Sequence, residues 1–262
     1  MSGTVAAGFV TIAGQRLETA WWGPAPEVAP TLVLLHEGLG SVGLWRDFPP
    51  VLAAATGWGV FAWSRAGYGH SAPVTPPRPL SYMHDEAASG VAPVLDAAGV
   101  GPCVLLGHSD GASIAALYAA TMTDPRLRGL ILLAPHFVVE DICITGIAAA
   151  RERYLHGELR ARLARHHDDV DGAFRGWNGA WLDPGFRAWD ITAAARGIRL
   201  PTLVVQGEAD PYGTAEQAAI AARTIPAPVT TVLLPGIGHA PHLEAAAATL
   251  AAVAGFVAPL RD

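Results

Sequence analysis

The sequence has few charged residues, few cysteines and no long apolar run. Asp, Glu, Lys and Arg make up 15% of its 262 residues, and the acidic residues outnumber the basic ones by 23 to 17. The net charge of -6 provides no basic face for a polyphosphate backbone, and no local tract of Lys and Arg compensates for it. We therefore expect no nucleic-acid partner.

The lack of long apolar segments bears on the location of the protein. No stretch reaches the roughly 20 residues needed to cross a bilayer, and residues 1–20 show no basic leader followed by an apolar block. We expect a cytoplasmic protein without a membrane partner, in which Cys103 and Cys143 are reduced and buried. No residue pattern predicts an oligomeric state.

Apolar residues are abundant, at 51% of the sequence, which is enough for a sizeable core. Short apolar runs alternate with Ala-rich helical patterns, as is typical of a mostly parallel sheet flanked by helices, and the length suits one α/β domain over residues 1–262. The expected strands are Gly8–Ile12, Leu17–Trp21, Thr31–Leu35, Val60–Trp63, Cys103–Leu106, Leu130–Leu133, Thr202–Val205 and Thr231–Leu234. The expected helices are Trp45–Ala55, Tyr82–Ala98, Ala112–Met122, Ala215–Arg223 and Leu243–Phe256. The first two strands predict an antiparallel hairpin with Ala13 and Gly14 in its turn.

Residues 134–201 form a stretch far longer than a single crossover needs. It contains an Arg-rich amphipathic segment, residues 151–165, and an aromatic group of Phe174, Trp177, Trp181, Phe186 and Trp189. We predict a helical cap, at about residues 136–196, over the carboxyl edge of the sheet, where open α/β sheets bind ligands. The aromatic side chains either line that site or pack the cap onto the core.

A Gly-His-Ser-Asp-Gly motif at residues 107–111 lies between an expected strand and the helical pattern that begins at Ala112. In a strand-to-helix turn this motif predicts a nucleophile elbow, because the two glycines permit a sharp turn and a close approach of helix and strand. Ser109 is therefore the candidate nucleophile. The alternative is a serine that only caps the helix.

A serine nucleophile needs a base and a carboxylate that orients the base. Asp210 lies just beyond the expected strand Thr202–Val205, and His239 lies just beyond Thr231–Leu234, in the chain order of a Ser-Asp-His triad. Both loops are expected to open at the same sheet edge as Ser109.

Three residues compete for these roles. Glu208 comes early after its strand, and Asp141 follows the neighbouring strand, so Asp210 is favoured over both. His242 falls at the start of the last helix, where a surface position or a supporting role is more common than a catalytic one.

The segment His-Glu-Gly-Leu-Gly, residues 36–40, follows the expected strand Thr31–Leu35 and is the predicted oxyanion loop. One amide of this loop, which we assign to Gly38, would act with the amide of Asp110 as the pair of donors that acyl transfer needs.

The ordered motifs resemble the α/β-hydrolase superfamily over nearly the whole chain, and within it the bacterial esterase and lactonase-like members with a helical cap. The matching segments are residues 36–40, 65–71, 107–111, Asp210 and the His-Ala-Pro-His-Leu-Glu segment at 239–244. The resemblance implies an eight-stranded sheet with an antiparallel edge, the Ser109, Asp210 and His239 triad, and no metal or organic cofactor. Dehalogenases and epoxide hydrolases of this fold have an aspartate at the elbow, so Ser109 argues against both.

Glu37 departs from that resemblance, because many relatives have glycine at this position. In one interpretation its carboxylate faces the site, where it would bind a cationic or hydroxylated substrate or raise the pKa of His239. In the other it points away and pairs with a neighbour such as Arg65.

Four further side chains are candidates to contact the substrate or to support the site, namely His136, Trp177, Trp181 and Tyr212. The His-His-Asp-Asp run at residues 166–169 predicts a solvated polar face rather than a metal site, because adjacent side chains diverge around the chain.

The sequence therefore predicts a serine hydrolase that cleaves a small, partly apolar carboxylic ester or lactone through an acyl-enzyme intermediate. The fold does not decide which carbonyl is attacked, so carbon–carbon or amide cleavage and perhydrolysis stay open with the same triad. A noncatalytic receptor that binds a small ligand in the same pocket is the alternative from another functional class.

Overall fold

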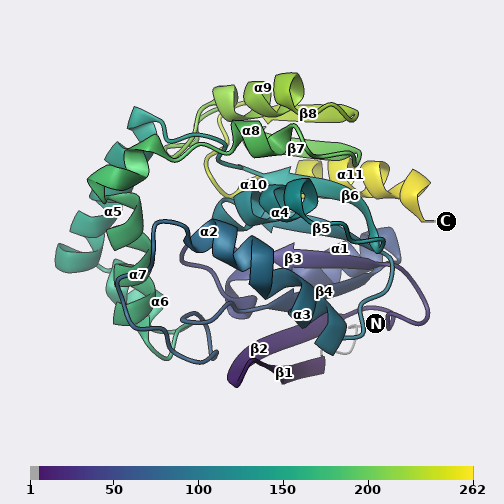
Figure 1. The fold of residues 1–262 in the computed structure, drawn as a ribbon, viewed down its shortest axis with the longest axis horizontal. Coiled ribbons are helices and arrows are strands. Elements are labelled where there is room, and N and C mark those ends of the chain that lie inside the picture. The colour runs from purple at the N-terminus through teal and green to yellow at the C-terminus, as the bar shows by residue number, and fades with distance from the viewer. Residues whose placement is uncertain (1–5, 262) are drawn as a thin grey trace.

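A computed structural model describes residues 6–261, and its centre is an eight-stranded sheet in the order β1-β2-β4-β3-β5-β6-β7-β8 (Figure 1). The strands are β1 Ala6–Ile12, β2 Gln15–Trp22, β3 Thr31–Leu35, β4 Gly59–Trp63, β5 Cys103–His108, β6 Leu127–Leu133, β7 Thr202–Gly207 and β8 Val229–Leu234. Strand β2 pairs antiparallel with β1 and β4, and every other pairing in this sheet is parallel. The predicted mostly parallel eight-stranded sheet is thus confirmed.

The hairpin at the edge of the sheet turns at Ala13 and Gly14, as predicted. Both residues have positive φ, 48° at Ala13 and 80° at Gly14. Positive φ at both central positions gives the turn the twist that two antiparallel strands need.

Helices cover both faces of the sheet (Figure 1). They are α1 Phe48–Thr56, α2 Tyr82–Asp85, α3 Val91–Ala97, α4 Asp110–Thr121, α8 Thr192–Ala195, α9 Ala215–Thr224, α10 Pro241–Glu244 and α11 Ala246–Val257. Apolar side chains alternate along the buried strands: Leu32 and Leu34 of β3 face α1 and α11, whereas Val33 and Leu35 face the layer of α2, α3 and α4. This alternation produces one core on each side of the sheet.

The predicted helix Tyr82–Ala98 is confirmed as a continuous helical stretch over residues 82–97, but it is not α-helical throughout. The structure divides it into α2, a π-helical segment at Glu86–Gly90, and α3. Pro93 explains the interruption, because proline lacks an N–H and its ring clashes with the carbonyl four residues earlier in a continuous α-helix.

Two further predicted helices need correction. Trp45–Ala55 does not begin at Trp45, because Pro49 and Pro50 lack the N–H groups that would continue a helix from that residue, so α1 starts at Phe48. Leu243–Phe256 is divided at Ala245, whose φ of -133° and ψ of 50° are not helical.

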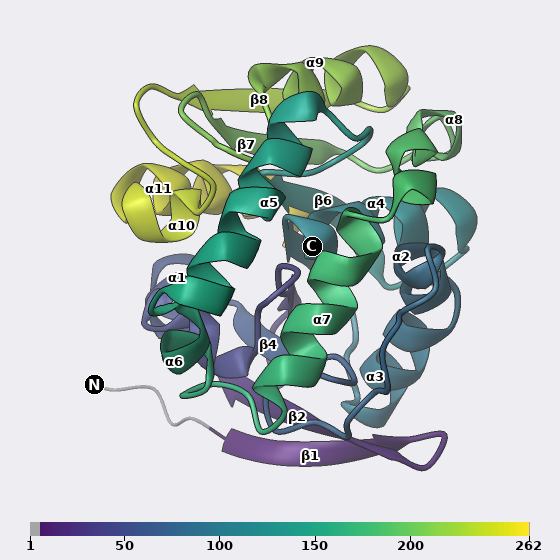
Figure 2. The same ribbon diagram turned by 90° about the vertical axis from the view of Figure 1, so that its left-hand side faces the viewer.

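Three helices of the long insert lie across the carboxyl ends of the strands (Figure 2). We call α5 Asp141–His156, α6 Leu159–Leu163 and α7 Val170–Trp181 the overlying helices. Aromatic side chains pack along α7 and the short turn that follows it; for example, the rings of Trp181 and Phe186 lie 4.8 Å apart. Helix α8 belongs instead to the sheet face, where it packs against α4 and α9.

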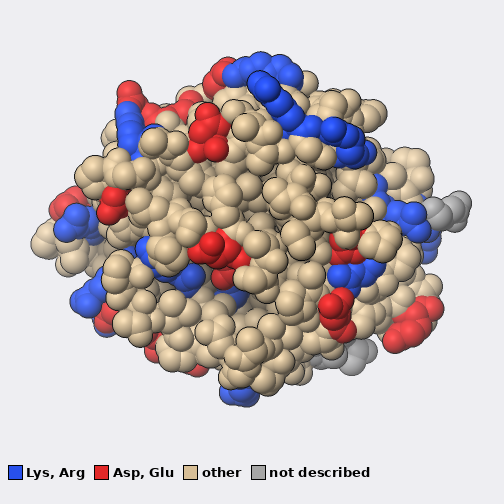
Figure 3. Space-filling view, viewed as in Figure 1, with Lys and Arg blue, Asp and Glu red and all other residues tan. Residues whose placement is uncertain are grey.

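Other expectations concern the surface and the cysteines. Cys103 and Cys143 are both buried and free, as predicted. No helix within residues 6–261 has the length and apolar character needed to span a membrane. On the face shown in Figure 3, acidic and basic side chains are interspersed among uncharged groups, so neither sign dominates that face.

The approach of α4 to β3 generates a testable prediction about stability. A Cβ at Gly111 would overlap the carbonyl oxygen of Leu35, whereas a Cβ at Gly179 on α7 meets nothing within 4 Å. We predict that Gly111→Ala lowers the free energy of unfolding by about 1–3 kcal/mol or more. The matched Gly179→Ala should raise it by about 0.5–1 kcal/mol, and urea unfolding measures both. Equal effects of the two substitutions would contradict the packing argument.

Candidate active site

Ser109 stands at a tight turn between β5 and α4. Its φ of 53° and ψ of -119° are unusual for a residue with a side chain, and its amide donates to the carbonyl of Leu133 at 2.9 Å. A Cβ at Gly107 would overlap the backbone of Gly111. The two glycines of the motif are therefore required by the close contact of strand and helix, as the sequence predicts.

The structure brings Ser109, His239 and Asp210 together in one hydrogen-bonded chain. His239 Nε2 lies 2.8 Å from Ser109 Oγ, and His239 Nδ1 lies 2.7 Å from Asp210 Oδ2. Because a carboxylate only accepts, Nδ1 carries a proton and the neutral ring presents the Nε2 lone pair to the serine hydroxyl. This is the arrangement in which an imidazole accepts a proton from a hydroxyl.

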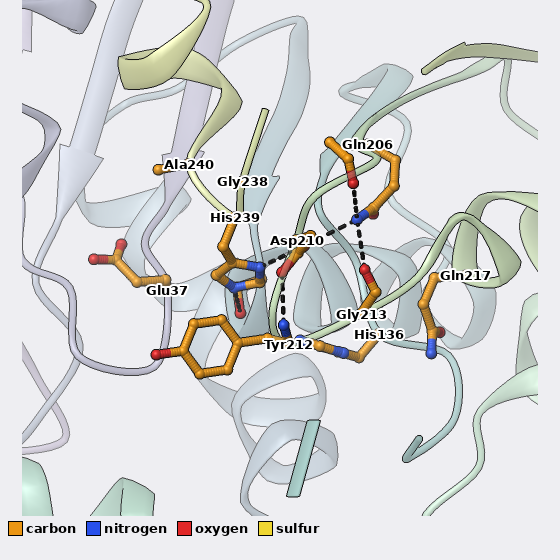
Figure 4. Close-up of polar contacts among 12 residues, drawn as sticks. Glu37, His136, Gln206, Asp210, Tyr212, Gly213, Gln217, Gly238, His239 and Ala240 are labelled. Carbon is orange, nitrogen blue, oxygen red and sulfur yellow. Dashed lines mark hydrogen bonds and ion pairs between the residues drawn. The ribbon is translucent and has the colours of Figure 1, made fainter. Parts of the chain in front are cut away.

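Asp210 is held by donors on every side (Figure 4). Besides His239, its carboxylate accepts from Gln206 Nε2 at 2.9 Å and from the Tyr212 amide at 2.8 Å. Burial alone would raise the pKa of Asp210, but the hydrogen bond and charge of His239 outweigh it, followed by the contacts of Tyr212 and Gln206. The pKa of Asp210 is therefore lowered, and the carboxylate stays charged. Gln206, a buried amide at the end of β7, was not among the predicted residues.

The loop that carries His239 is fixed by two side chains that the prediction did not include. The carboxylate of Glu244 accepts from the amides of Gly238 at 2.8 Å and Ala240 at 3.0 Å. His108 Nε2 donates to the carbonyl of His239 at 2.7 Å. These contacts hold the main chain on both sides of His239 and so fix the position of its imidazole.

The rival residues lie elsewhere. Glu208 is exposed, and the side chain of Asp141 is 88% exposed and pairs with Arg187 on the surface. His242 is buried, so a surface position for it is wrong; its ring packs against Trp45 at 5.0 Å and against His108 at 4.8 Å. His242 therefore packs behind the residue that precedes Ser109.

A cavity of about 180 Å³ opens above Ser109. Its polar wall comes from the sheet edge, and its apolar wall comes largely from the overlying helices. The lining residues are Glu37, Gly38, Leu39, Ser109, Asp110, His136, Cys143, Ile147, Trp177, Trp181, Tyr212 and His239. All five predicted substrate-contact candidates are therefore cavity residues, and the small volume suits a small ligand.

Two polar residues of the cavity wall have shifted pKa values. Burial, followed by the charge of His239, lowers the pKa of His136 to about 3, so its imidazole is neutral. Burial raises the pKa of Asp110, whose carboxylate accepts from the Tyr82 hydroxyl and, at 3.2 Å, from Trp181 Nε1. Asp110 thereby joins the elbow to α7.

The predicted oxyanion loop packs tightly against its neighbours. Arg65 donates to the carbonyls of His36 at 2.5 Å and Glu37 at 3.0 Å, and a Cβ at Gly38 would overlap Trp177. Asp110 is the first residue of α4, so its amide has no acceptor within the helix. The donor role of Gly38 stays a prediction.

Glu37 pairs with a neighbour, as one of the two interpretations predicted, but the neighbour is His108 and not Arg65, whose guanidinium binds main-chain oxygens of the loop. The Glu37 carboxylate points away from the His239 ring (Figure 4), and its Oε2 lies 3.5 Å from Nδ1 of His108. The residue lines the cavity while its charge is directed toward a buried histidine.

The solvated polar face predicted for residues 166–169 is wrong for His167, which is 5% exposed. Its Nδ1 accepts from the Gly69 amide and its Nε2 donates to the Leu39 carbonyl, both at 2.9 Å. The ring lies inward because it partners these two main-chain groups, and it connects the segment between α6 and α7 to the predicted oxyanion loop.

The sequence is similar to a known protein family and to individual curated proteins. A sequence model described as the Alpha/beta hydrolase family matches residues 32–253. The bifunctional esterase/perhydrolase DCH of Acinetobacter calcoaceticus is 27% identical over 218 residues, which cover 72% of this chain and 76% of that protein. Epoxide hydrolase B of Mycobacterium tuberculosis is 32% identical over 124 residues, but these cover 47% of this chain and only 34% of that protein.

Solved structures share the fold over nearly the full chain. VinJ superposes with a TM-score of 0.76 at 22% identity, covering 97% of this chain and 99% of the other. An enol-lactonase from Burkholderia xenovorans superposes with a TM-score of 0.72 at 20% identity, covering 95% and 99%. At these identities the likeness concerns the fold alone.

The lowered pKa of Asp210 predicts how stability depends on pH. A carboxyl with a depressed pKa stabilises the fold above its unfolded pKa, and this contribution is lost as pH falls through the folded value. The difference in free energy of unfolding between the native protein and Asp210→Asn should therefore be constant above about pH 5 and shrink as pH falls below about 4, the ordinary pKa of an aspartate. Urea unfolding measures the difference. The control is Asp47→Asn, at an exposed residue whose side chain makes no capping bond; a gap that narrows equally in this control would refute the assignment.

Proposed function

Since the chain belongs to the alpha/beta hydrolase family, we propose that it is a serine hydrolase that cleaves a small carboxylic ester or lactone through an acyl-enzyme intermediate. The observation that carries this proposal is the chain of two hydrogen bonds, 2.8 Å and 2.7 Å long, that joins Ser109, His239 and Asp210 at the floor of a cavity. In this proposal the overlying helices form the cap of the site.

In the proposed mechanism His239 Nε2 accepts the Ser109 proton while Oγ attacks the substrate carbonyl. The resulting oxyanion is stabilised by the amide of Asp110 at the start of α4 and by that of Gly38. His239 then gives its proton to the departing alcohol oxygen, and a water that it activates hydrolyses the acyl-enzyme. The charged Asp210 keeps the imidazole oriented and stabilises its protonated form.

The substrate class follows from the cavity and from one relative. A volume of about 180 Å³, walled by Ile147, Trp177 and Trp181, suits a short acyl or lactone group with an apolar side. The similarity to a bifunctional esterase/perhydrolase over 72% of this chain supports ester cleavage.

Perhydrolysis is a second candidate, because that same relative is named for both activities. Hydrogen peroxide would replace water as the nucleophile on the same acyl-enzyme, and the product would be a peracid. Peracid formation from a short-chain ester and hydrogen peroxide separates this activity from simple hydrolysis. Amide or carbon–carbon cleavage uses the same triad and would appear as a lack of ester turnover.

Replacement of the nucleophile tests the proposal. We predict that Ser109→Ala lowers turnover of p-nitrophenyl esters by about 10,000-fold or more, because the acyl-enzyme cannot form. The measurement is nitrophenol release across acyl lengths, with circular dichroism to verify the fold. Ser89→Ala, at an exposed serine outside the cavity, serves as the matched control and should keep native rates.

The outcomes separate the functional classes. Native turnover that survives in Ser109→Ala would overturn Ser109 as the nucleophile. Absence of turnover in the native protein, together with failure of a fluorophosphonate to label Ser109, would favour a noncatalytic ligand receptor.

The cavity wall predicts the preference for acyl length. Ile147 of α5 lines the cavity, so Ile147→Ala should move the preferred acyl chain to esters about two carbons longer. Ile220→Ala, at a core residue of α9 outside the cavity, should lower the free energy of unfolding by about 2–5 kcal/mol, as Ile147→Ala does, but leave the preferred acyl length unchanged. The kcat/KM values for the ester series measure the preference. An unchanged profile in Ile147→Ala would remove this residue from the acyl site.

A further inference from the structure

A polar pair, formed by the buried His108 and the half-buried Glu37, lies directly behind the candidate triad. His108 is the residue before Ser109 and is 3% exposed; its ring centroid lies 5.1 Å from that of His239. Its Nε2 faces a carbonyl oxygen, that of His239, at 2.7 Å, and its Nδ1 faces a carboxylate oxygen, that of Glu37, at 3.5 Å. Both neighbours are acceptors, so the geometry favours a ring that is protonated at both nitrogens.

The surroundings of Glu37 also favour an ion pair with His108. Arg65 binds main-chain carbonyls and not this carboxylate, and His36 already accepts the Arg65 amide at its Nε2, so neither supplies a countercharge through a side-chain contact. Within residues 6–261, His108 is the one ionisable side chain within ion-pair distance of Glu37. The Glu37 carboxylate occupies the space that a Cβ at Gly40 would need, so the glycine leaves room for the carboxylate in this position.

This pair connects the two loops that the proposed mechanism uses. Glu37 directly precedes Gly38 in the oxyanion loop, and His108 holds the main chain of the base, His239, from the strand that ends at the nucleophile. A shift of either loop would lengthen one of the two contacts of His108. Positioning errors of about 1 Å between reacting groups cost up to about 100-fold in rate.

We propose that Glu37 and His108 are a positioning pair, an ion pair that keeps the oxyanion loop and the main chain of His239 in register with Ser109. This inference rests on the proposed serine hydrolase function. It also gives a reason for a carboxylate where many relatives have glycine: the charge is directed at a buried imidazolium instead of at the substrate.

The charges of the pair favour its formation at neutral pH. Burial lowers the pKa of His108, but the contact with Glu37 and its charge outweigh burial, so the pKa of His108 is raised. Burial raises the pKa of Glu37, but His108 outweighs it, so the pKa of Glu37 is lowered. The other titratable groups around the pair, from every element packed against it, are His36, Asp210, His136, His166, His167, His239 and His242.

A substrate-independent experiment tests the pair. The probe is a fluorophosphonate that labels an activated serine, and the measured quantity is the second-order rate of Ser109 labelling in the full chain. We expect Glu37→Gln and His108→Gln each to slow labelling by about 10-fold to 100-fold. Because both remove the same ion pair, the double variant should be no slower than His108→Gln alone. Glu37→Asp, which keeps the charge, should recover part of the loss.

The pH profile distinguishes positioning from a general loss of structure. An ion pair made by a histidine with a raised pKa is complete below the ordinary value near 6.5 and is lost as pH rises through the raised value. Labelling of the native protein should therefore show a decline at alkaline pH that Glu37→Gln lacks, because its His108 has no carboxylate to hold the proton. Glu216→Gln, which breaks a surface pair with Arg223, is the matched control and should keep the native profile.

Each outcome bears on one proposal. Multiplicative losses in the double variant, or an alkaline decline that persists unchanged in Glu37→Gln, would overturn the positioning pair and leave the hydrolase assignment intact. A native protein that neither reacts with the probe nor turns over esters would instead overturn the proposed function. If Glu37→Gln does not fold, Glu37→Asp and His108→Gln supply the rates and the profile by themselves.

Discussion

At the turn between β5 and α4 the chain is packed so closely that the rest of the site depends on it. A side chain at Gly107 would overlap the backbone at Gly111, and one at Gly111 would overlap the carbonyl of Leu35. The turn holds Ser109 at a φ of 53°, a conformation that costs about 1–3 kcal/mol and persists only where its surroundings enforce it. The two apolar cores of the sheet enforce it here, so the hydroxyl of Ser109 has a fixed position.

The buried ionisable groups around the Ser109 hydroxyl differ in charge because the groups they contact differ. Asp210 is surrounded by donors and stays charged, so it can support a protonated His239. The Nδ1 atoms of His136 and His108 both lack a hydrogen-bond partner in the described chain, but the Glu37 carboxylate lies 3.5 Å from that of His108. Burial, followed by the charge of His239, keeps His136 neutral. His108 faces two acceptors and is the buried histidine whose pKa rises. Similar imidazoles in one small volume therefore differ in charge because their immediate partners differ.

Two parts of the fold line the cavity. The loops at the sheet edge supply the polar groups, and the overlying helices supply most of the apolar wall. Contacts between the two sets are specific: Trp181 donates to Asp110 at the start of α4, and His167 donates to Leu39 of the predicted oxyanion loop. The fold by itself does not decide which reaction such a site performs. In the proposed enzyme, the overlying helices would select the substrate.

The sequence alone determined the features that arise from neighbouring residues. Strand periodicity gave the sheet, the glycines at 107 and 111 marked the turn, and loops directly after β7 and β8 identified Asp210 and His239, because parallel strands bring their carboxyl ends to one edge. Only the tertiary structure decided that Glu37 faces His108, that His167 turns inward and that Glu244 holds the His239 loop. Each of those contacts depends on the packing of a side chain against a segment that local patterns do not specify. Hydrogen-bonding preferences name the type of partner, but which partner is within reach is a property of the folded chain.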